Sequence, residues 1–292
     1  MRAFFSTILF LVIGSGYAQQ ALPMNPWESV APGGSEIYTD LKEAGKNASS
    51  VYRMELSGQE VFLDKKFASR IVRMTSLMAL RIANNGLTEF PGSLLSLRAL
   101  VYFSSRGNKF TTLPDSLGLW GSLRFLELHQ AAFDTVPEGI YGIPRLQSLT
   151  FNSNTDTLRF TGALKYCSKR LVELKIYNCL FDTLPEEFGQ LTALTKLVLY
   201  KCKLNEIPDP VYQLDGLSEL WLDSNNLATL PSSIALMQNL TYLSLRGNRI
   251  TKITSSICFL SKLVVLDLRG NPLDPYDVRV VEALLPNTRV LF

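Results

Sequence analysis

Hydrophobic positions recur along this chain with a period of 23 residues over most of its length. Within each period three apolar residues follow the spacing LxxLxL, so that apolar and polar positions alternate at the end of the run. Alternation with period two is typical of a short β-strand with one buried face. A fixed period of this length indicates a solenoid, in which each turn buries its apolar face only against its neighbours.

A column of small residues marks the period. Its members are spaced 23 residues apart, except for 25 residues between the fourth and the fifth: Asn85, Asn108, Ala131, Asn154, Cys179, Cys202, Asn225, Asn248 and Asn271. A buried amide can both donate to backbone carbonyls and accept from backbone N–H groups, which suits it to join consecutive turns. Because alanine and cysteine lack an amide, we predict that the middle turns are held together by fewer hydrogen bonds.

One complete turn runs from Leu217 to Met237 and reads LxxLxLxxNxLxxLPxxIxxM. The same frame fits the turns that begin at Leu77 and Leu194. The pattern resembles the leucine-rich repeat family, in the LP-type 23-residue subclass of plant Ras-group-related and Ras-scaffold proteins, over roughly residues 51 to 292. The resemblance implies an α/β solenoid shaped like a horseshoe, with a concave parallel β-sheet. Because proline cannot donate to a strand ladder, the convex side is expected to be irregular or 3-10.

Capping signals stand at both ends of the repeats. Asp40 followed by Glu43 resembles a capping box that opens a short helix, and Asp274 followed by Pro275 predicts a helix ending near Leu285. Residues 288–292 are expected to form a last strand. The predicted organisation is a signal peptide over residues 1–18, an N-terminal cap region over 19–50, repeats in about ten turns over 51–273, and a C-terminal cap helix with the last strand over 274–292.

The first eighteen residues have the pattern of a secretory signal peptide. Arg2 precedes an apolar run from Phe4 to Ile13, and the small residues Gly16 and Ala18 precede the expected cleavage site after Ala18. An apolar run this short falls well below the roughly 20 residues that span a bilayer. We therefore expect an exported protein, secreted or held in the periplasm or cell envelope, without a transmembrane anchor.

Composition removes several classes of function. A formal net charge of +3 with 19% charged residues gives no reason to expect a nucleic-acid partner. His129 is the only histidine, and the neighbouring Glu127 has no nucleophile, glycine-rich loop or metal-ligand spacing beside it. The sequence therefore predicts no enzyme, no metal site and no cofactor.

The four cysteines, Cys167, Cys179, Cys202 and Cys258, do not form an evident disulfide framework. Cys179 and Cys202 would lie about 5 Å apart on adjacent turns, near enough for a bridge by distance alone. Side chains in a parallel ladder rarely present the dihedral angle that a disulfide needs. We therefore expect free buried thiols.

The repeat frame also predicts which side chains point outward from the concave sheet. An aromatic strip, Tyr177, Tyr200, Trp221 and Tyr242, would cross four consecutive turns, and Tyr102 with Phe125 would form a second exposed pair. Lys196, Glu219, Asp223 and Arg246 would supply charges around the strip, with Lys196 between Glu173 and Glu219. Tyrosine and tryptophan carry much of the energy of protein interfaces. The alternative is cross-strand packing that only stiffens the sheet.

The sequence thus predicts an exported, non-enzymatic leucine-rich repeat binding module that recognises a protein or peptide on its concave face. One alternative is a glycan ligand stacked on the aromatic strip, and another is a structural envelope spacer without a discrete ligand. The segment from Asp156 to Arg170 loses the LP signature, and it is either a tolerated surface insertion or a partner-binding protrusion. The sequence leaves the ligand's identity and the oligomeric state open.

Overall fold

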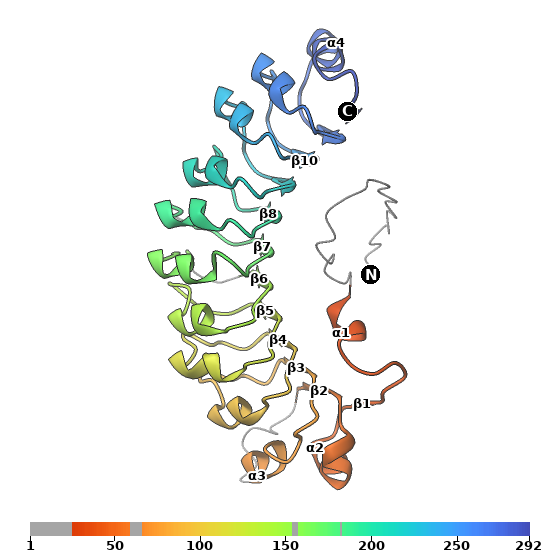
Figure 1. Ribbon diagram of the computed structural model, residues 1–292, viewed down its shortest axis with the longest axis vertical. Helices are drawn as coiled ribbons and strands as arrows, with labels where there is room; N and C mark the ends of the chain where they lie inside the picture. The colour runs from red at the N-terminus through yellow and green to blue at the C-terminus, as the bar shows by residue number, and fades with distance from the viewer. Residues whose placement is uncertain (1–24, 59–65, 154–156, 182) are drawn as a thin grey trace.

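The computed structural model describes residues 25–58, 66–153, 157–181 and 183–292. Twelve parallel strands form one sheet in chain order, from β1 to β12, and line the concave side of a curved solenoid (Figure 1). This confirms the predicted leucine-rich repeat horseshoe. The strands are β1 (Ile37–Tyr38), β2 (Arg53–Ser57), β3 (Ala79–Ala83), β4 (Tyr102–Arg106), β5 (Phe125–His129), β6 (Ser148–Asn152), β7 (Glu173–Tyr177), β8 (Lys196–Tyr200), β9 (Glu219–Trp221), β10 (Tyr242–Ser244), β11 (Val265–Asp267) and β12 (Arg289–Leu291).

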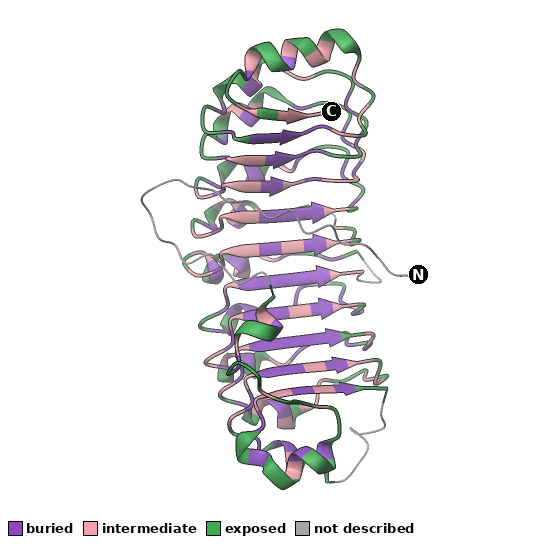
Figure 2. Cartoon of the chain, turned by 90° about the vertical axis from the view of Figure 1, so that its right-hand side faces the viewer, coloured by how far each residue is buried: buried purple, intermediate pink, exposed green. Residues whose placement is uncertain are grey.

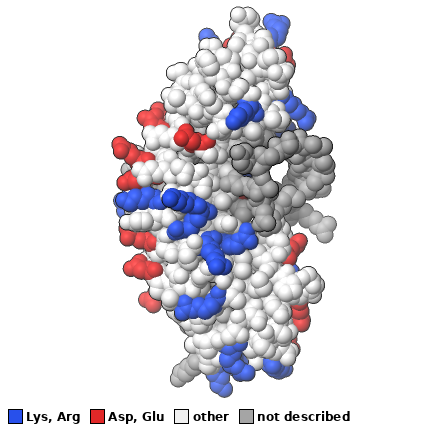
Figure 3. Space-filling model, viewed as in Figure 1, with Lys and Arg blue, Asp and Glu red and all other residues white. Residues whose placement is uncertain are grey.

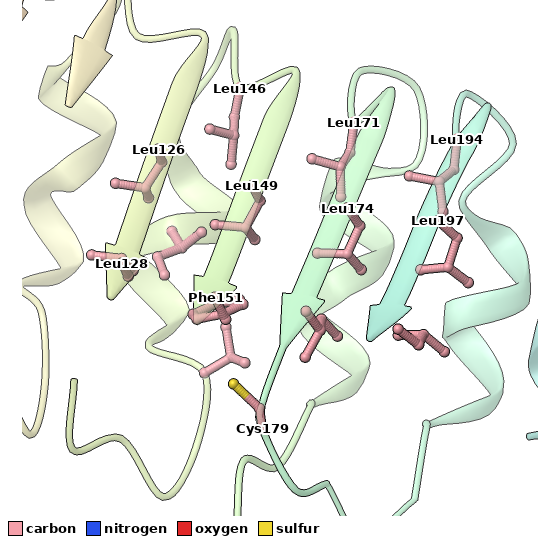
Figure 4. Packing of buried hydrophobic residues seen from close by; sticks show 14 of the residues in the cluster. Leu126, Leu128, Leu146, Leu149, Phe151, Leu171, Leu174, Cys179, Leu194 and Leu197 are labelled. Atoms are coloured by element: carbon pink, nitrogen blue, oxygen red, sulfur yellow. The ribbon is translucent and has the colours of Figure 1, made fainter. Parts of the chain in front are cut away.

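The leucines of the LxL pattern point inward and form continuous rows through the core. Leu126, Leu149 and Leu174 are paired in register on β5, β6 and β7, and Leu197 continues the row on β8. Figure 4 shows these rows lying side by side beneath the strands. Each leucine is at most 1% exposed, so every turn buries its apolar face against the next one.

The convex side consists of short 3-10 helices, as predicted. They are η1 (Gly45–Ser50), η3 (Gly92–Ser96), η4 (Asp115–Leu119), η5 (Glu138–Gly142), η6 (Gly162–Cys167), η7 (Glu186–Gln190), η8 (Asp209–Gln213), η9 (Ser232–Leu236) and η10 (Ser255–Phe259). The proline of the LP signature precedes most of these helices in an extended conformation, as Pro185 precedes η7. Its carbonyl accepts the first 3-10 hydrogen bond, here from Phe188. The proline therefore sets where the convex turn begins.

After each strand from β3 to β11, the residue immediately before the asparagine column has a positive φ, between 52° and 71°: Asn84, Gly107, Gln130, Ser153, Asn178, Lys201, Ser224, Gly247 and Gly270. In the described residues, the next position, which belongs to the asparagine column, is partly buried at Asn85 and Asn271 and buried at Asn108, Ala131, Cys179, Cys202, Asn225 and Asn248. Glycine reaches the positive-φ conformation without strain, and the other residues tolerate it because the turns on both sides hold them in place.

The asparagine column joins the turns as expected. The Asn225 carboxamide oxygen accepts from the backbone nitrogens of Cys202 and Leu204 at 2.9 and 3.2 Å, and its nitrogen donates to the Leu199 carbonyl at 2.7 Å. At Cys202 the thiol instead reaches the carbonyls of Ile176 and Tyr200 at 3.5 Å. The weaker bonding predicted for the middle turns is confirmed at this position, while Asn154 lies outside the described residues.

Both predicted caps are present. Asp40 accepts hydrogen bonds from the backbone nitrogens of Lys42 and Glu43 at the start of α2 (Leu41–Ala44), which leads into η1. Asp274 caps α4 (Pro275–Leu284) in the same way, and β12 follows as the last strand. In the longer first turn, α3 (Phe67–Ile71) packs behind the sheet. The sequence did not predict α1 (Pro26–Ser29) or β1, which pairs with β2.

The described part of the segment between Asp156 and Arg170 packs into the solenoid. Leu158 and Leu164 are buried in the common core, and Leu158 bridges to Phe181 of the next turn. Tyr166 is exposed on the outside. Residues 157–170 thus form a modified turn rather than a separate protrusion.

The four cysteines all lie in the described residues and form no disulfide, as expected; Cys258 is exposed and the others are buried. Burial raises the pKa of the Cys202 thiol to about 12. Figure 3 shows acidic side chains along the convex side of the visible face and basic side chains grouped across its middle. Within the described residues, no helix has the length and apolar character needed to cross a bilayer.

Candidate functional site on the concave face

The concave face has two parts with different surfaces. Residues 25–36 lie in front of the sheet and place α1 over the strands of the first repeats (Figures 1 and 2). We call the surface of β3, β4 and β5 beneath this segment the covered part, and the surface of β7, β8, β9 and β10 the open part.

Trp27 of α1 closes the covered part. Its indole packs with Ala79, Tyr102 and Phe125 in an apolar cluster separate from the main core. Tyr102 is 1% exposed and Phe125 is 2% exposed. The expectation that Tyr102 and Phe125 form an exposed pair is therefore wrong, because a segment outside the repeats buries both rings.

A polar network lies beside this cluster. The Tyr102 hydroxyl donates to Glu127 at 2.6 Å, and the Glu127 carboxylate lies 3.4 Å from Nε2 of His129. Burial opposes ionisation of Glu127, but hydrogen bonds from His129 and Tyr102 outweigh it and hold its pKa below the usual value. Burial and the charge of Glu127 raise the pKa of Tyr102 above its usual value. The network therefore keeps an ionised carboxylate and a neutral phenol next to Trp27.

The open part contains the four predicted strip residues, all partly exposed. Their ring contacts join them in two pairs. Tyr177 and Tyr200 are neighbours in register, with ring centroids 6.1 Å apart and planes tilted by 58°. Trp221 and Tyr242 are diagonal neighbours whose rings stack at 4.4 Å and 23°. Burial raises the pKa of Tyr177 and of Tyr242 to about 12, so both hydroxyls stay neutral hydrogen-bonding groups at neutral pH.

Lys196 and Glu219 border the stacked pair. The ammonium of Lys196 lies 2.9 Å from Glu219 and 5.4 Å from the centre of the Trp221 ring, while the indole nitrogen of Trp221 donates to Glu219 at 3.3 Å. Lys196 lies between Glu173 and Glu219 in the sheet register, as expected. It pairs with Glu219 alone, because the Glu173 carboxylate binds Lys175 at 2.8 Å and accepts a hydrogen bond from the hydroxyl of Ser148. The charges around the strip therefore form local pairs, one between β8 and β9 and one along β7.

Asp223 and Arg246 follow at the carboxyl end of this face. The carboxylate of Asp223 accepts from the Ser244 hydroxyl and from the backbone nitrogen of Arg246, whose side chain is exposed. Burial raises the pKa of Asp223; the bond from Ser244 opposes the shift, and the charge of the nearby Asp267 adds to it. Asp267 is itself paired with Arg269, whose Nε lies 2.9 Å away. Arg246 is exposed and Asp223 is partly exposed, so these two side chains can contact a ligand, whereas Ser244 and Asp267 are buried.

In the described residues no group of three or more histidine, cysteine, aspartate or glutamate side chains is arranged to hold a metal ion. Sequence reasoning missed Trp27 and Arg81, both of which lie at the covered part. One signal was available: the outward column that contains Tyr102 and Phe125 begins with the small Ala79, which leaves room beside two large rings.

A single parallel sheet with one 3-10 turn per 23-residue period defines a leucine-rich repeat solenoid. Residues 215–273 match the family model described as leucine rich repeat. No protein with a curated description matches the sequence.

Solved structures with this fold resemble most of the chain. An internalin, inlF of Listeria monocytogenes, has a TM-score of 0.55 and 19% identity over 86% of this chain and 85% of its own. The leucine-rich repeat domain of the type III effector XopL has a TM-score of 0.55 and 22% identity over 86% and 79%. The plant peptide hormone receptor RGFR1, solved in complex with RGF2, has a TM-score of 0.51 and 21% identity over 81% of this chain and 46% of the receptor chain. At these identities the similarity establishes the fold alone.

Proposed function

We propose that this protein is an exported, non-enzymatic binding module of the LP-type 23-residue subclass that recognises a protein or peptide on the open part of its concave face. Tyr177, Tyr200, Trp221 and Tyr242 would make the central contacts. Lys196, Glu219, Asp223 and Arg246 would fix the ligand's register at the rim.

The observation that carries this proposal is the stacked pair of Trp221 and Tyr242, which remains partly exposed on β9 and β10 of the open part. Large aromatic rings supply the anchoring energy in many protein interfaces because they bury much area with little loss of side-chain freedom. The charged groups beside the pair provide the polar rim that such interfaces usually have. One protein with this fold, RGFR1, is a peptide hormone receptor, so the fold is compatible with peptide recognition.

Export is part of the same proposal and rests on the sequence of residues 1–18, which lie outside the described residues. The test is N-terminal sequencing of the protein recovered from its native source. A mature chain that begins at Gln19 would support export, and a chain that retains Arg2 to Ala18 would contradict it.

A glycan is the second candidate ligand. The ring planes of Trp221 and Tyr242 differ by only 23°, and such a flat platform suits stacking against a sugar ring. Glu219 and Asp223 lie two residues to either side of Trp221, and carboxylates can accept hydrogen bonds from sugar hydroxyls. Competition by soluble oligosaccharides, with no competition by deglycosylated protein, would favour this candidate.

The direct test is capture of a ligand from native extracellular or periplasmic extract by the chain beginning at Gln19. The wild type is compared with a Tyr200→Ala/Trp221→Ala variant and with a matched control, Tyr166→Ala/Tyr276→Ala, which removes two exposed rings away from the concave sheet. Circular dichroism confirms that all three are folded. The proposal expects capture by the wild type and the control and loss in the concave variant. Equal capture by all three would move the site elsewhere on the solenoid, and no capture by any of them would favour a spacer.

A further inference from the structure

We use the word recess for the place on the covered part of the concave face where Trp27 is buried. Ala79, Tyr102 and Phe125 occupy equivalent outward positions on β3, β4 and β5, in register. Because alanine has only a methyl group, the space beside Tyr102 is open at that level, and the indole of Trp27 fills it. Trp27 is only 3% exposed there.

The contacts in the recess are those that suit an indole. The Trp27 and Tyr102 rings meet edge to face, with centroids 5.7 Å apart and planes at 65°. The guanidinium of Arg81 lies 4.1 Å above the Trp27 ring and 5.8 Å from the Tyr102 ring. Glu55 lies 3.9 Å from Arg81 and favours its position. An edge-to-face partner and a cation over the ring select a large, electron-rich aromatic side chain over an aliphatic one.

The segment that carries Trp27 is attached to the sheet mainly through this side chain. Asn25, Glu28 and Ser29 are exposed, and the backbone nitrogens of Glu28 and Ser29 bond to the Asn25 carbonyl within the segment. Val30 packs at the edge of the cluster. Trp27 is the one large side chain that is buried in residues 25–36, where the small Ala31 is the other buried residue. A single buried aromatic ring among mostly exposed residues is the arrangement of a peptide held by an anchor residue.

The segment rejoins the solenoid through a turn. Pro32 accepts a hydrogen bond from the backbone nitrogen of Ser35, and Gly34 lies between them with a φ of 75°. Arg53 of β2 then donates to the Ser35 carbonyl, and β1 pairs with β2. Trp27 and the turn at residues 32–35 are therefore separate attachments to the solenoid. Residues 25–31 can leave the recess while β1 stays paired with β2.

We propose that this recess is a peptide subsite for a tryptophan-bearing segment, occupied within each molecule by residues 25–36 and able to take the same segment from a second molecule. The subsite is distinct from the open part, because it uses Ala79, Arg81, Tyr102 and Phe125. Its ligand is defined by an indole that stacks beneath an arginine and against a tyrosine edge.

The test is binding of a fluorescein-labelled peptide with the sequence of residues 25–36, NPWESVAPGGSE, measured by anisotropy. A tethered segment acts at an effective concentration of about 1 mM or more, so the full-length wild type should bind the free peptide weakly. The full-length Trp27→Ala variant, whose own segment lacks the anchor, should bind it at least about 10-fold more tightly. A peptide carrying Trp27→Ala should bind that variant at least about 30-fold more weakly than the native peptide, since anchor residues often account for a loss of this size.

Two further variants locate the binding. Adding Ala79→Leu to Trp27→Ala should fill the recess and reduce binding at least about 10-fold, with an unchanged far-UV circular dichroism spectrum. Should that variant unfold, Arg81→Ala in the same background removes the cation over the ring and should reduce binding about 3-fold to 10-fold. Tyr200→Ala/Trp221→Ala in the Trp27→Ala background should leave peptide binding unchanged, which separates this subsite from the ligand site of the open part.

Equal peptide binding by wild type and Trp27→Ala would overturn the proposal, as would equal binding of the native and tryptophan-free peptides. Retention of full binding after both Ala79→Leu and Arg81→Ala would overturn the assigned location. None of these outcomes bears on capture of a ligand by the open part.

Discussion

The covered and open parts of the concave face arise from the same repeat, yet one is sealed and the other is accessible. Both carry large aromatic residues at outward positions, Tyr102 and Phe125 in one and Trp221 and Tyr242 in the other. The difference comes from Trp27, which lies outside the repeats and fills the recess beside Ala79. An outward position in a solenoid therefore defines the direction of a side chain, while its exposure depends on segments that the repeat does not encode.

The covered and open parts should depend equally on the asparagine column. Substitutions in this column are expected to have the largest effects on the free energy of unfolding. Asn108 lies behind the covered part and Asn225 behind the open part, and both are buried. Each accepts from and donates to backbone groups of neighbouring turns. Asn108→Ala and Asn225→Ala should each lower the free energy of unfolding by about 3 kcal/mol, because several buried backbone groups lose their partners.

Chemical denaturation measures both values, and Cys202→Ala is the control at the same column position. This change should cost much less, because the thiol makes only weak contacts at 3.5 Å. A large difference between the two asparagine variants would mean that the framework itself differs between the two parts.

Removing the anchor should convert the covered part into a second open surface. Trp27→Ala should cost about 2 kcal/mol of local docking free energy, the amount typical of burying a large apolar side chain. Hydrogen exchange should then accelerate at the amides of Ser29 and Val30, which bond to Asn25 and Pro26. Exchange in β8 and β9 should stay unchanged, and Tyr276→Ala in the cap helix should change neither region. Unaltered protection of residues 28–30 would show that the segment is held by something other than Trp27.

Acidification should affect the two parts in opposite directions. The pKa of Glu127 is lowered in the fold, so its stabilising contribution is present above the ordinary value of 4.5 and is lost as pH falls through the folded value. The pKa of Asp223 is raised in the fold, so its ionised form opposes folding, and that penalty disappears as pH falls from above the folded value toward 3.8.

Measurement of unfolding free energy between pH 6 and pH 3 tests both signs. Compared with the wild type, Glu127→Gln should lose less stability on acidification, and Asp223→Asn should lose more. Identical pH profiles for the two variants would contradict the assigned environments.

The smallest effect is expected at the rim of the open part. Lys196→Ala removes a half-exposed ion pair with Glu219, and such pairs contribute only about 0.2–1 kcal/mol to stability. Its larger consequence should be on ligand binding, because Lys196 also lies over the Trp221 ring. Lys201→Ala is the control, because Lys201 lies over the Tyr200 ring at the end of β8 as Lys196 lies over the Trp221 ring. A stability loss well above 1 kcal/mol would show that Lys196 supports the sheet itself.

The sequence was sufficient for features that depend on local chemistry. The LxL alternation predicted the strand faces, the proline of the LP signature predicted the 3-10 side, and Asp40 and Asp274 predicted the caps. Each of these depends on residues a few positions apart or one repeat apart. The 23-residue period was therefore enough to predict almost all of the sheet and the turns behind it.

The surface of the site was less predictable. Trp27 packs against Ala79, which lies 52 positions later in the sequence. The segment around Trp27 has no repeat, so no spacing in the sequence marks this contact. Glu173 pairs with Lys175 on its own strand rather than with Lys196, because long side chains choose among several partners of similar energy. Trp221 and Tyr242 are diagonal neighbours, as the repeat register predicts. Register does not determine how the rings are oriented, and their contacts divide the predicted strip into two pairs.

The most direct test of the divided concave face is hydroxyl-radical footprinting of its aromatic side chains in the wild type and in Trp27→Ala. The account predicts slow modification of Tyr102 and Phe125 in the wild type, with faster modification of Tyr177, Tyr200, Trp221 and Tyr242. In Trp27→Ala only Tyr102 and Phe125 should become more reactive. Equal reactivity of both sets in the wild type, or no change at Tyr102 and Phe125 in the variant, would contradict it.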